Sequence, residues 1–334
     1  MQPILLMNRS SRGTLYCILS AICYTLMGIC LRELSESCDP VWVNSVQALV
    51  STTVFGIYLT ITSVRGRSAW PPLSVAVSLM ALGIITQLGG SSYQWSLGVI
   101  GLTVGNPLNM GVTLAASALL GLLILGERVR GRGITAIVLI TVSIFLLSHG
   151  AEETNQEVMA TDTIAAATDS QSTNGKEAAT RSGSLRIMMG IAAACLAGIA
   201  FAILTVGVRK MATENTAPEA IVFYINAMGV VFLGPWALLR LGLDGVMATS
   251  PRDYGVMLAT GVFNLLGFLL VTKALQLTAV VRVNLINSAL TTALTVLAGI
   301  VIFAEPANSQ LLVGILLTLV GMVLISTDGS TESE

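Results

Sequence analysis

The chain has 334 residues, of which 54% are hydrophobic and only 10% are charged, and its mean hydropathy is +0.82. Soluble domains carry about a quarter charged residues, so this composition excludes an ordinary water-soluble protein and predicts a protein that lies in a lipid bilayer. The formal net charge of −1 gives no support for nucleic-acid binding.

Apolar runs long enough to cross a bilayer, at about 20 residues for each crossing, recur along nearly the whole chain. We predict five spans in each half of the sequence. In the first half they cover residues 13–31, 41–63, 73–97, 102–125 and 133–148. In the second half they cover residues 186–208, 219–240, 254–276, 280–304 and 310–326.

The segment 150–184 differs in composition from the spans on either side of it. It is rich in Ala, Thr and Ser, carries six acidic residues against Lys176 and Arg181, and shows no apolar periodicity. These features are typical of a flexible, hydrophilic linker. The predicted domains are therefore a five-helix repeat, an extracytoplasmic linker, a second five-helix repeat and a cytoplasmic tail, at residues 1–149, 150–184, 185–327 and 328–334.

The two halves are related by a constant offset of 178 residues. At this offset GNPLNMGVTLAASALLGLLILGE aligns without a gap with VNLINSALTTALTVLAGIVIFAE. The alignment matches residues that an apolar chain would not match by chance, namely Asn106 with Asn284, Asn109 with Asn287, Glu127 with Glu305, Gly83 with Gly261 and Gly89 with Gly267. The chain is therefore an internal duplication.

An odd number of spans in each repeat has a geometric consequence. Five crossings leave the chain on the opposite side of the bilayer, so the second repeat is inserted upside down relative to the first. The predicted fold is an all-α integral membrane protein with ten transmembrane helices in two inverted five-helix repeats, an architecture typical of secondary transporters.

Lys and Arg in the short loops predict the orientation of the chain. If the N-terminus is cytoplasmic, the inner loops hold ten of them: Arg9, Arg12, Arg65, Arg67, Arg128, Arg130, Arg132, Arg209, Lys210 and Arg282. The outer short loops then hold only three, Arg32, Arg240 and Arg252. We therefore expect a multi-pass protein of the cytoplasmic (inner) cell membrane with both termini in the cytoplasm.

The fourth span of each half has a polar start, a middle of small residues and a terminal Gly-Glu or Ala-Glu. The two segments are NPLNMGVTLAASALLGLLILGERVRGRG and NLINSALTTALTVLAGIVIFAEPANSQ. In this pattern the chain resembles the EamA-type repeat carriers of the drug/metabolite transporter superfamily. The resemblance implies a carrier of small metabolites that works by alternating access, most often as an exporter, with Glu127 and Glu305 as the acids of the family motif.

Two pairs of asparagines are the first candidates for contact with a substrate or for gating. Asn106 and Asn109 are three residues apart and share one face at a predicted helix start, and the duplication places Asn284 and Asn287 in the same way. Free N–H groups and the partial positive charge of a helix N-terminus suit a substrate carboxylate or polar head group. The alternative is that these side chains cap their helices or bond to neighbouring helices.

Other polar residues inside the spans are also candidates. Gln87 and Asn264 lie near the middle of equivalent spans, where an amide must face either a wet cavity or a partner helix. Lys273 is the only Lys or Arg well inside a span, and it either binds an anionic group together with Arg282 or extends to the interface. We expect Glu127 and Glu305 mainly to fix turns between helices.

The sequence has no Gly-rich phosphate loop, no nucleophile–His–acid set and no metal-ligand spacing. We therefore expect neither an enzyme nor a cofactor nor a bound metal. The predicted function is secondary transport, with export favoured, of a small polar or amphipathic metabolite, an amino acid or derivative being favoured. A channel-like facilitator and a carrier of sugars or sugar phosphates are the alternatives. The expected partners are the lipid bilayer and a small-molecule substrate, and a homodimer is left open.

Overall fold

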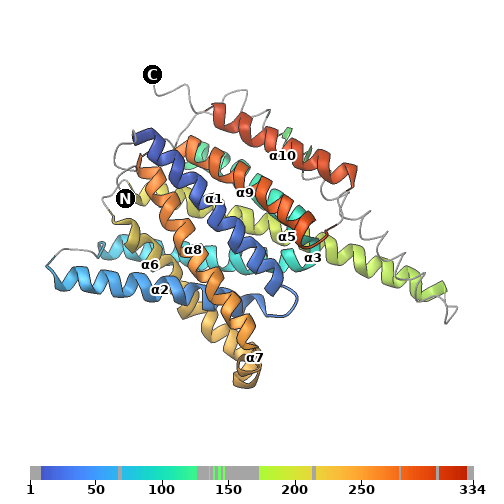
Figure 1. Ribbon diagram of the computed structural model, residues 1–334, viewed down its shortest axis with the longest axis horizontal. Coiled ribbons are helices and arrows are strands. Elements are labelled where there is room, and N and C mark those ends of the chain that lie inside the picture. The colour runs from blue at the N-terminus through green and yellow to red at the C-terminus, as the bar shows by residue number, and fades with distance from the viewer. Residues whose placement is uncertain are drawn as a thin grey trace.

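The computed structural model describes residues 9–66, 70–125, 173–212, 216–277, 280–305 and 308–328, together with residues 135, 138, 139, 142, 143 and 146. All regular structure in this part of the chain is helical (Figure 1). The helices are α1 (Arg9–Leu34), α2 (Pro40–Val64), α3 (Leu73–Leu125), α5 (Thr173–Ala212), α6 (Pro218–Met228), η1 (Gly229–Leu233), α7 (Gly234–Met247), α8 (Pro251–Leu277), α9 (Val280–Ile302) and α10 (Ser309–Asp328).

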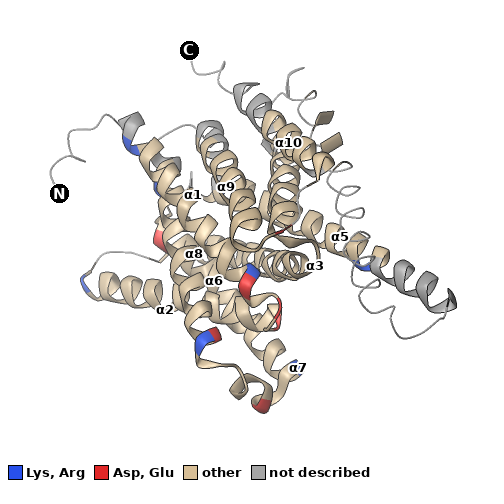
Figure 2. Cartoon of the chain, turned by 45° about the vertical axis from the view of Figure 1, so that its right-hand side comes forward, with Lys and Arg blue, Asp and Glu red and all other residues tan. Residues whose placement is uncertain are grey.

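Six helical segments of the described residues are long and apolar enough to cross a membrane. They are Arg12–Leu34, Pro40–Val64, Leu73–Gly121, Ser184–Val208, Pro218–Met247 and Pro251–Ala274. Large apolar side chains cover the outside of the bundle, such as Leu239 at 86% and Val64 at 83% exposure. The charged residues that Figure 2 colours lie mainly at helix ends. An apolar surface of this extent is favourable in contact with lipid hydrocarbon and unfavourable in contact with water. The chain is therefore a multi-pass integral membrane protein.

Helix α3 contains the third and fourth predicted spans in one element. It breaks at Gly101, where φ is 73° and ψ is 174°. This backbone region is open essentially only to glycine because any Cβ would be strained there. The break lies between the predicted spans 73–97 and 102–125, as the sequence indicates.

Helices α6, η1 and α7 together form the predicted span 219–240. Pro218 starts the element, where its missing N–H needs no partner. The π-helical turn η1 directly precedes a segment with Pro235, which cannot donate to the preceding turn. The sequence pattern did not indicate this irregularity.

The structure corrects one part of the predicted linker. Helix α5 begins at Thr173, so residues 173–184 are helical and not irregular. The segment TNGKEAATRSG contains Ala, Lys, Glu and Arg, which are good helix formers even without an apolar stripe. The remaining linker residues, most of the predicted span 133–148 and residues 329–334 lie outside the described residues.

The duplication is visible in how the helices pack. Helix α1 packs along α8 and α5 packs along α3, and the two pairs are related by the 178-residue offset. Equivalent glycines permit these close approaches, as small residues do between membrane helices. A Cβ on Gly89 of α3 would lie 2.6 Å from Ala200 Cβ on α5, and one on Gly267 of α8 would lie 3.1 Å from Tyr24 Cε1 on α1. The two halves therefore contact each other in equivalent ways.

Candidate functional site

A cavity of about 240 Å³ lies between the two halves. Helices α1, α2 and α3 line it from the first half, and α5, α6, α8 and α9 line it from the second. Pockets for drug-sized ligands measure roughly 300–1,000 Å³, so this cavity suits a small molecule.

The described lining of this cavity combines a largely apolar surface with uncharged polar side chains, and it contains no Asp, Glu, Lys or Arg. Its carboxamides are Asn44, Gln47, Gln87, Asn106, Asn109, Asn226, Asn264 and Asn287. Its hydroxyl groups belong to Tyr24, Thr86, Tyr93, Thr113, Ser117, Thr205, Ser288 and Thr291. A bound molecule would therefore meet neutral hydrogen-bonding groups, the rings of Phe201 and Phe268, and aliphatic side chains such as Leu31.

Both polar atoms of the Asn106 carboxamide bond to protein groups. Tyr93 Oη donates to Asn106 Oδ1 at 3.0 Å, and Asn106 Nδ2 donates to Thr295 Oγ1 at 2.7 Å. All three side chains are more than nine-tenths buried. The chain of bonds joins both segments of α3 to α9, so Asn106 connects the two repeats.

Asn109 has a different environment on the next turn of α3. Its Nδ2 donates to the carbonyl oxygen of Ala194 on α5 at 3.2 Å, and its Oδ1 is buried without a partner. The orientation of the amide is fixed, because only the N–H side can bond to a carbonyl oxygen. Gly198 allows this approach, since a Cβ there would lie 2.8 Å from the Asn109 carbonyl oxygen.

Other carboxamides of the lining also donate their N–H to the protein. Gln87 donates to the Ile225 carbonyl oxygen at 3.5 Å, and Asn226 donates to the Val222 carbonyl oxygen at 2.9 Å. Gln47 Nε2 lies 3.7 Å from the sulfur of Met27. Buried polar atoms without a hydrogen-bond partner remain at Gln47 Oε1, Asn109 Oδ1, Asn287 Oδ1 and Thr291 Oγ1. These four atoms are themselves buried, so the cavity surface is formed by other atoms of the lining residues.

The start of the α3 segment after Gly101 is already occupied by a carboxylate of the protein. Glu305 accepts hydrogen bonds from the backbone N–H groups of Leu102 at 2.8 Å and Thr103 at 2.7 Å. Arg32 Nε donates to the same carboxylate at 3.0 Å. The N–H groups that were expected to be free for a substrate carboxylate are thus satisfied. Through these bonds Glu305, which follows the end of α9, is held against the break in α3.

The structure brings most of the predicted site residues into the cavity. These are Gln87, Asn106, Asn109, Asn264 and Asn287. The side chain of Lys273 is exposed on α8, outside the cavity lining. The side chain of Asn284 and all of Glu127 lie outside the described residues.

Sequence reasoning missed several lining residues that helical spacing indicates. Asn44 lies three residues before Gln47, so both occupy one face of α2. Thr113 and Ser117 continue the face of Asn109 at intervals of four residues. A stripe of polar residues along an apolar span was therefore an available signal for a cavity.

Comparison with known proteins agrees with the duplicated architecture. A model described as the EamA-like transporter family matches residues 11–149 and 188–327, one match for each half. No curated protein matches the chain. A solved structure titled "Crystal structure of protein" is similar over 98% of this chain and 100% of that chain, with a TM-score of 0.59 and 14% sequence identity. This last similarity shows a shared fold alone.

Proposed function

Because the chain belongs to the EamA-like transporter family, whose members are membrane carriers and not enzymes, we propose that it is a secondary transporter working by alternating access. We further propose ten transmembrane helices in two inverted five-helix repeats. The substrate is a small polar or amphipathic metabolite, with an amino acid or derivative favoured and export as the direction. The observation that carries this proposal is the uncharged cavity between the repeats.

The position of the cavity supports alternating access. Inverted repeats place a substrate site at their interface, and exchanging the conformations of the two halves exposes it to one side or the other. Both halves contribute side chains to this cavity, and equivalent residues such as Asn109 and Asn287 face it from α3 and α9. In our proposal Gln87, Asn106, Asn109, Asn264, Asn284 and Asn287 bind the substrate or move with the change of access.

Ion pairs between the two halves support a closed conformation at one end of the bundle. We call this the ion-pair end; it holds Arg32–Glu305 at 3.0 Å, Arg252–Glu33 at 2.5 Å and Arg240–Asp39 at 3.3 Å. Each pair joins a residue of the first half to one of the second. Only the Arg32 and Glu305 side chains are both mostly buried, at 15% and 10% exposure. Opening this end would require these contacts to separate.

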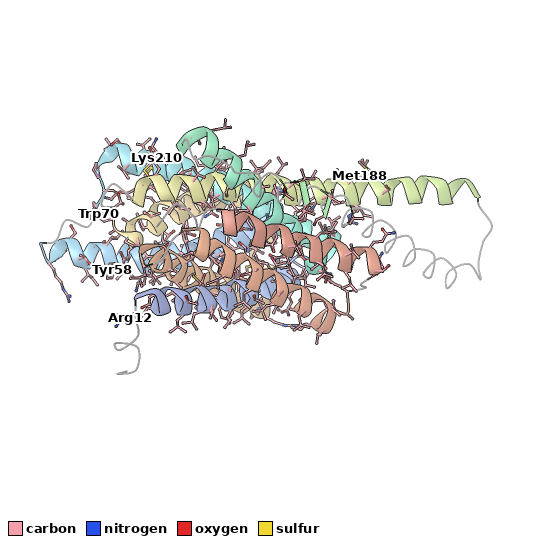
Figure 3. All side chains as sticks on the ribbon, turned by 90° about the horizontal axis from the view of Figure 1, so that it is seen from above. Arg12, Tyr58, Trp70, Met188 and Lys210 are labelled. Atoms are coloured by element: carbon pink, nitrogen blue, oxygen red, sulfur yellow. The ribbon has the colours of Figure 1, made fainter. Side chains whose placement is uncertain are left out.

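The distribution of basic residues supports an orientation. Arg12, Trp70 and Lys210 lie towards one end of the molecule and Met188 towards the other (Figure 3). The positive-inside rule places the Arg12 end in the cytoplasm. In our proposal both termini are cytoplasmic, the membrane is the cytoplasmic membrane, and the ion-pair end faces outward.

The proposed function is tested by counterflow in proteoliposomes that contain the purified protein. Vesicles are loaded with amino acids, sugars or amphipathic amines, and uptake of the labelled compound is followed. A carrier gives saturable uptake that is accelerated by substrate on the opposite side of the membrane. Uptake that rises linearly with concentration and shows no such acceleration would contradict a carrier and favour a channel-like facilitator.

A further inference from the structure

We propose that Glu305 is the gating residue of the ion-pair end. Its carboxylate holds this end closed through Arg32 and through the start of the α3 segment after Gly101. Release of the carboxylate opens the cavity towards that side of the membrane. The inference rests on the proposed transport function and assigns the control of access at one end to a single side chain.

The first argument is the position of the Glu305 carboxylate between the two repeats. Its Oε1 accepts from the Leu102 N–H at 2.8 Å and its Oε2 accepts from the Thr103 N–H at 2.7 Å. A Cβ on Gly101 would lie 2.7 Å from Oε1, and one on Gly299 of α9 would lie 2.7 Å from Oε2. Because both positions are glycine, the carboxylate binds directly to the backbone of α3, where the helix N-terminus favours a negative charge. It therefore joins α3 of the first repeat to the end of α9 in the second.

The second argument is the backbone that carries this side chain. Ala304 has a positive φ of 49°, and the Glu305 N–H donates to the Gly299 carbonyl oxygen at 3.1 Å. This arrangement is a helix C-terminal cap of the kind that usually places glycine at the residue with positive φ. The equivalent residue of the first repeat is indeed Gly126. An alanine in this conformation is strained, and such strain is typical of functional sites and switch regions.

The third argument is that the same two helices are joined again beside the cavity. Asn106 lies one helical turn after Thr103, and its Nδ2 donates to Thr295 Oγ1 on α9 at 2.7 Å. Asn106 also lines the cavity. Separation of α3 from α9 at Glu305 would therefore also pull on the bond at the cavity wall. A molecule bound at Asn106 and the opening of the ion-pair end thus act on one interface, which couples them.

The ion pair between Arg32 and Glu305 suits a contact that must form and break. Both side chains are mostly buried while the end is closed, so the loss of one partner leaves a buried charge. When the end opens, water reaches both charges and replaces the bonds that they lose. The two other ion pairs of this end each include an arginine that is already more than half exposed, at 51% and 80%, and we expect them to contribute little.

The experiment measures access to the cavity from the ion-pair end with a single reporter cysteine. Thr113→Cys, in the cavity lining, is introduced into a background in which the five native cysteines are serine. Ser250→Cys in the same background identifies the face of the membrane on which the ion-pair end lies. Right-side-out and inside-out membrane vesicles are treated with 2-(trimethylammonium)ethyl methanethiosulfonate, a small thiol reagent that does not cross the membrane. The rate of modification of the Thr113→Cys thiol is measured from each face.

Variants of the gating residue give the decisive comparison. We expect Glu305→Gln to raise the modification rate from the ion-pair face by about tenfold, because the closed state loses charged hydrogen bonds and its population falls. Glu305→Asp keeps the charge on a shorter side chain and should give a smaller increase. Glu36→Gln is the matched control, because Glu36 bonds to the same Arg32 but is 70% exposed, and it should leave the rate unchanged. An unchanged rate in folded Glu305→Gln, or an equal increase in Glu36→Gln, would overturn the inference.

The protein with Glu305 intact provides a test that does not depend on the folding of these variants. From the ion-pair face, the thiol of Thr113→Cys should react at least about tenfold more slowly than that of Ser250→Cys, which lies on the exposed surface. Equal rates would show that the end is not held closed and would overturn the inference.

Failure of this inference and failure of the carrier proposal give different results. Saturable counterflow together with an unchanged modification rate in Glu305→Gln would overturn the gating role and leave the carrier proposal intact. A raised modification rate together with linear, non-saturable flux would support the gating role and contradict the carrier.

Discussion

At the scale of single residues, the carboxylate of Glu305 has the largest set of partners of the ionised groups discussed above. It accepts two backbone hydrogen bonds from α3 and one from Arg32, and Arg32 also lies 5.5 Å from the centre of the Phe303 ring. The two backbone bonds join residues 203 and 202 positions apart in the sequence, and the Arg32 bond joins residues 273 apart. A motif acid can be recognised from the sequence, whereas its partners depend on the tertiary fold.

The variant Glu305→Gln tests this role. It keeps the shape of the side chain, removes the charge, and leaves the mostly buried Arg32 without its partner between the repeats. We expect a loss of about 2 kcal/mol of stability, measured by thermal unfolding in detergent. Glu36→Gln is the matched control, because Glu36 pairs with the same Arg32 but is 70% exposed, and we expect it to cost about 0–1 kcal/mol. Equal losses in the two variants would contradict the proposed difference.

The bond between Tyr93 and Asn106 allows a second test at this scale. Tyr93→Phe removes the donor and leaves Asn106 Oδ1 buried and unsatisfied. A double-mutant cycle with Asn106→Leu should give a coupling free energy of about 1 kcal/mol, because each substitution alone breaks the same bond. Additive losses would show that the two side chains do not stabilise each other.

The sequence identified Asn106 and Asn109 as equally good candidates, and the structure separates them. Both lie on one face of α3, as their spacing predicts. The neighbouring residues decide that both polar atoms of Asn106 bond to Tyr93 and Thr295, while Asn109 Oδ1 has no partner. Local spacing predicts which face a residue occupies, and the partner helices determine its chemistry.

At the scale of elements, the break in α3 is the clearest link between sequence and shape. Gly101 has a positive φ, and a Cβ at this position would lie 2.7 Å from Glu305 Oε1. The absence of a side chain at Gly101 therefore leaves room for the Glu305 carboxylate, which caps the helical segment after the break. The predicted spans anticipate the break. The π-helical turn η1 was not anticipated because it lies inside one continuous apolar span. The helical start of α5 at Thr173 was not anticipated because this segment has no apolar periodicity.

The cost of crowding at this break can be separated from the cost of backbone strain. Gly242 has nearly the same backbone angles, φ 68° and ψ 173°, and a Cβ added there would meet no atom within 4 Å. Gly242→Ala should cost about 1–3 kcal/mol from strain alone. Gly101→Ala should cost more, because the added methyl also displaces Glu305. Denaturation of both variants under the same conditions checks this order, and a larger loss in Gly242→Ala would contradict it.

At the scale of the whole molecule, the duplication predicted the relation between the halves. The offset of 178 residues relates α1 to α5 and the first segment of α3 to α8. The contact of α1 with α8 is therefore equivalent to the contact of α5 with α3. The predicted topology places Arg32, Arg240 and Arg252 on one side of the membrane, but it could not show which acids they pair with, because the partners lie far apart along the chain.

The orientation of the molecule gives a prediction at this scale. Ser250 lies at the ion-pair end before α8, Ser63 lies at the opposite end of α2, and both are exposed. In a background in which the five cysteines are replaced by serine, an impermeant maleimide should label Ser250→Cys on intact cells. It should label Ser63→Cys only after the cells are permeabilised. The reverse pattern would invert the proposed orientation.

Transport by a variant of the cavity tests our proposal most directly. In this proposal the uncharged cavity between the repeats is the transport site. The experiment measures counterflow in proteoliposomes that contain the double variant Asn109→Leu, Asn287→Leu. The wild type and Thr60→Val, a substitution on the exposed face of α2, are the controls. We predict that the double variant folds and inserts, although it is less stable than the control because it lacks the Asn109–Ala194 bond, and that its KM is raised by about tenfold or more. An unchanged KM and maximal rate in a folded double variant would show that the substrate passes elsewhere.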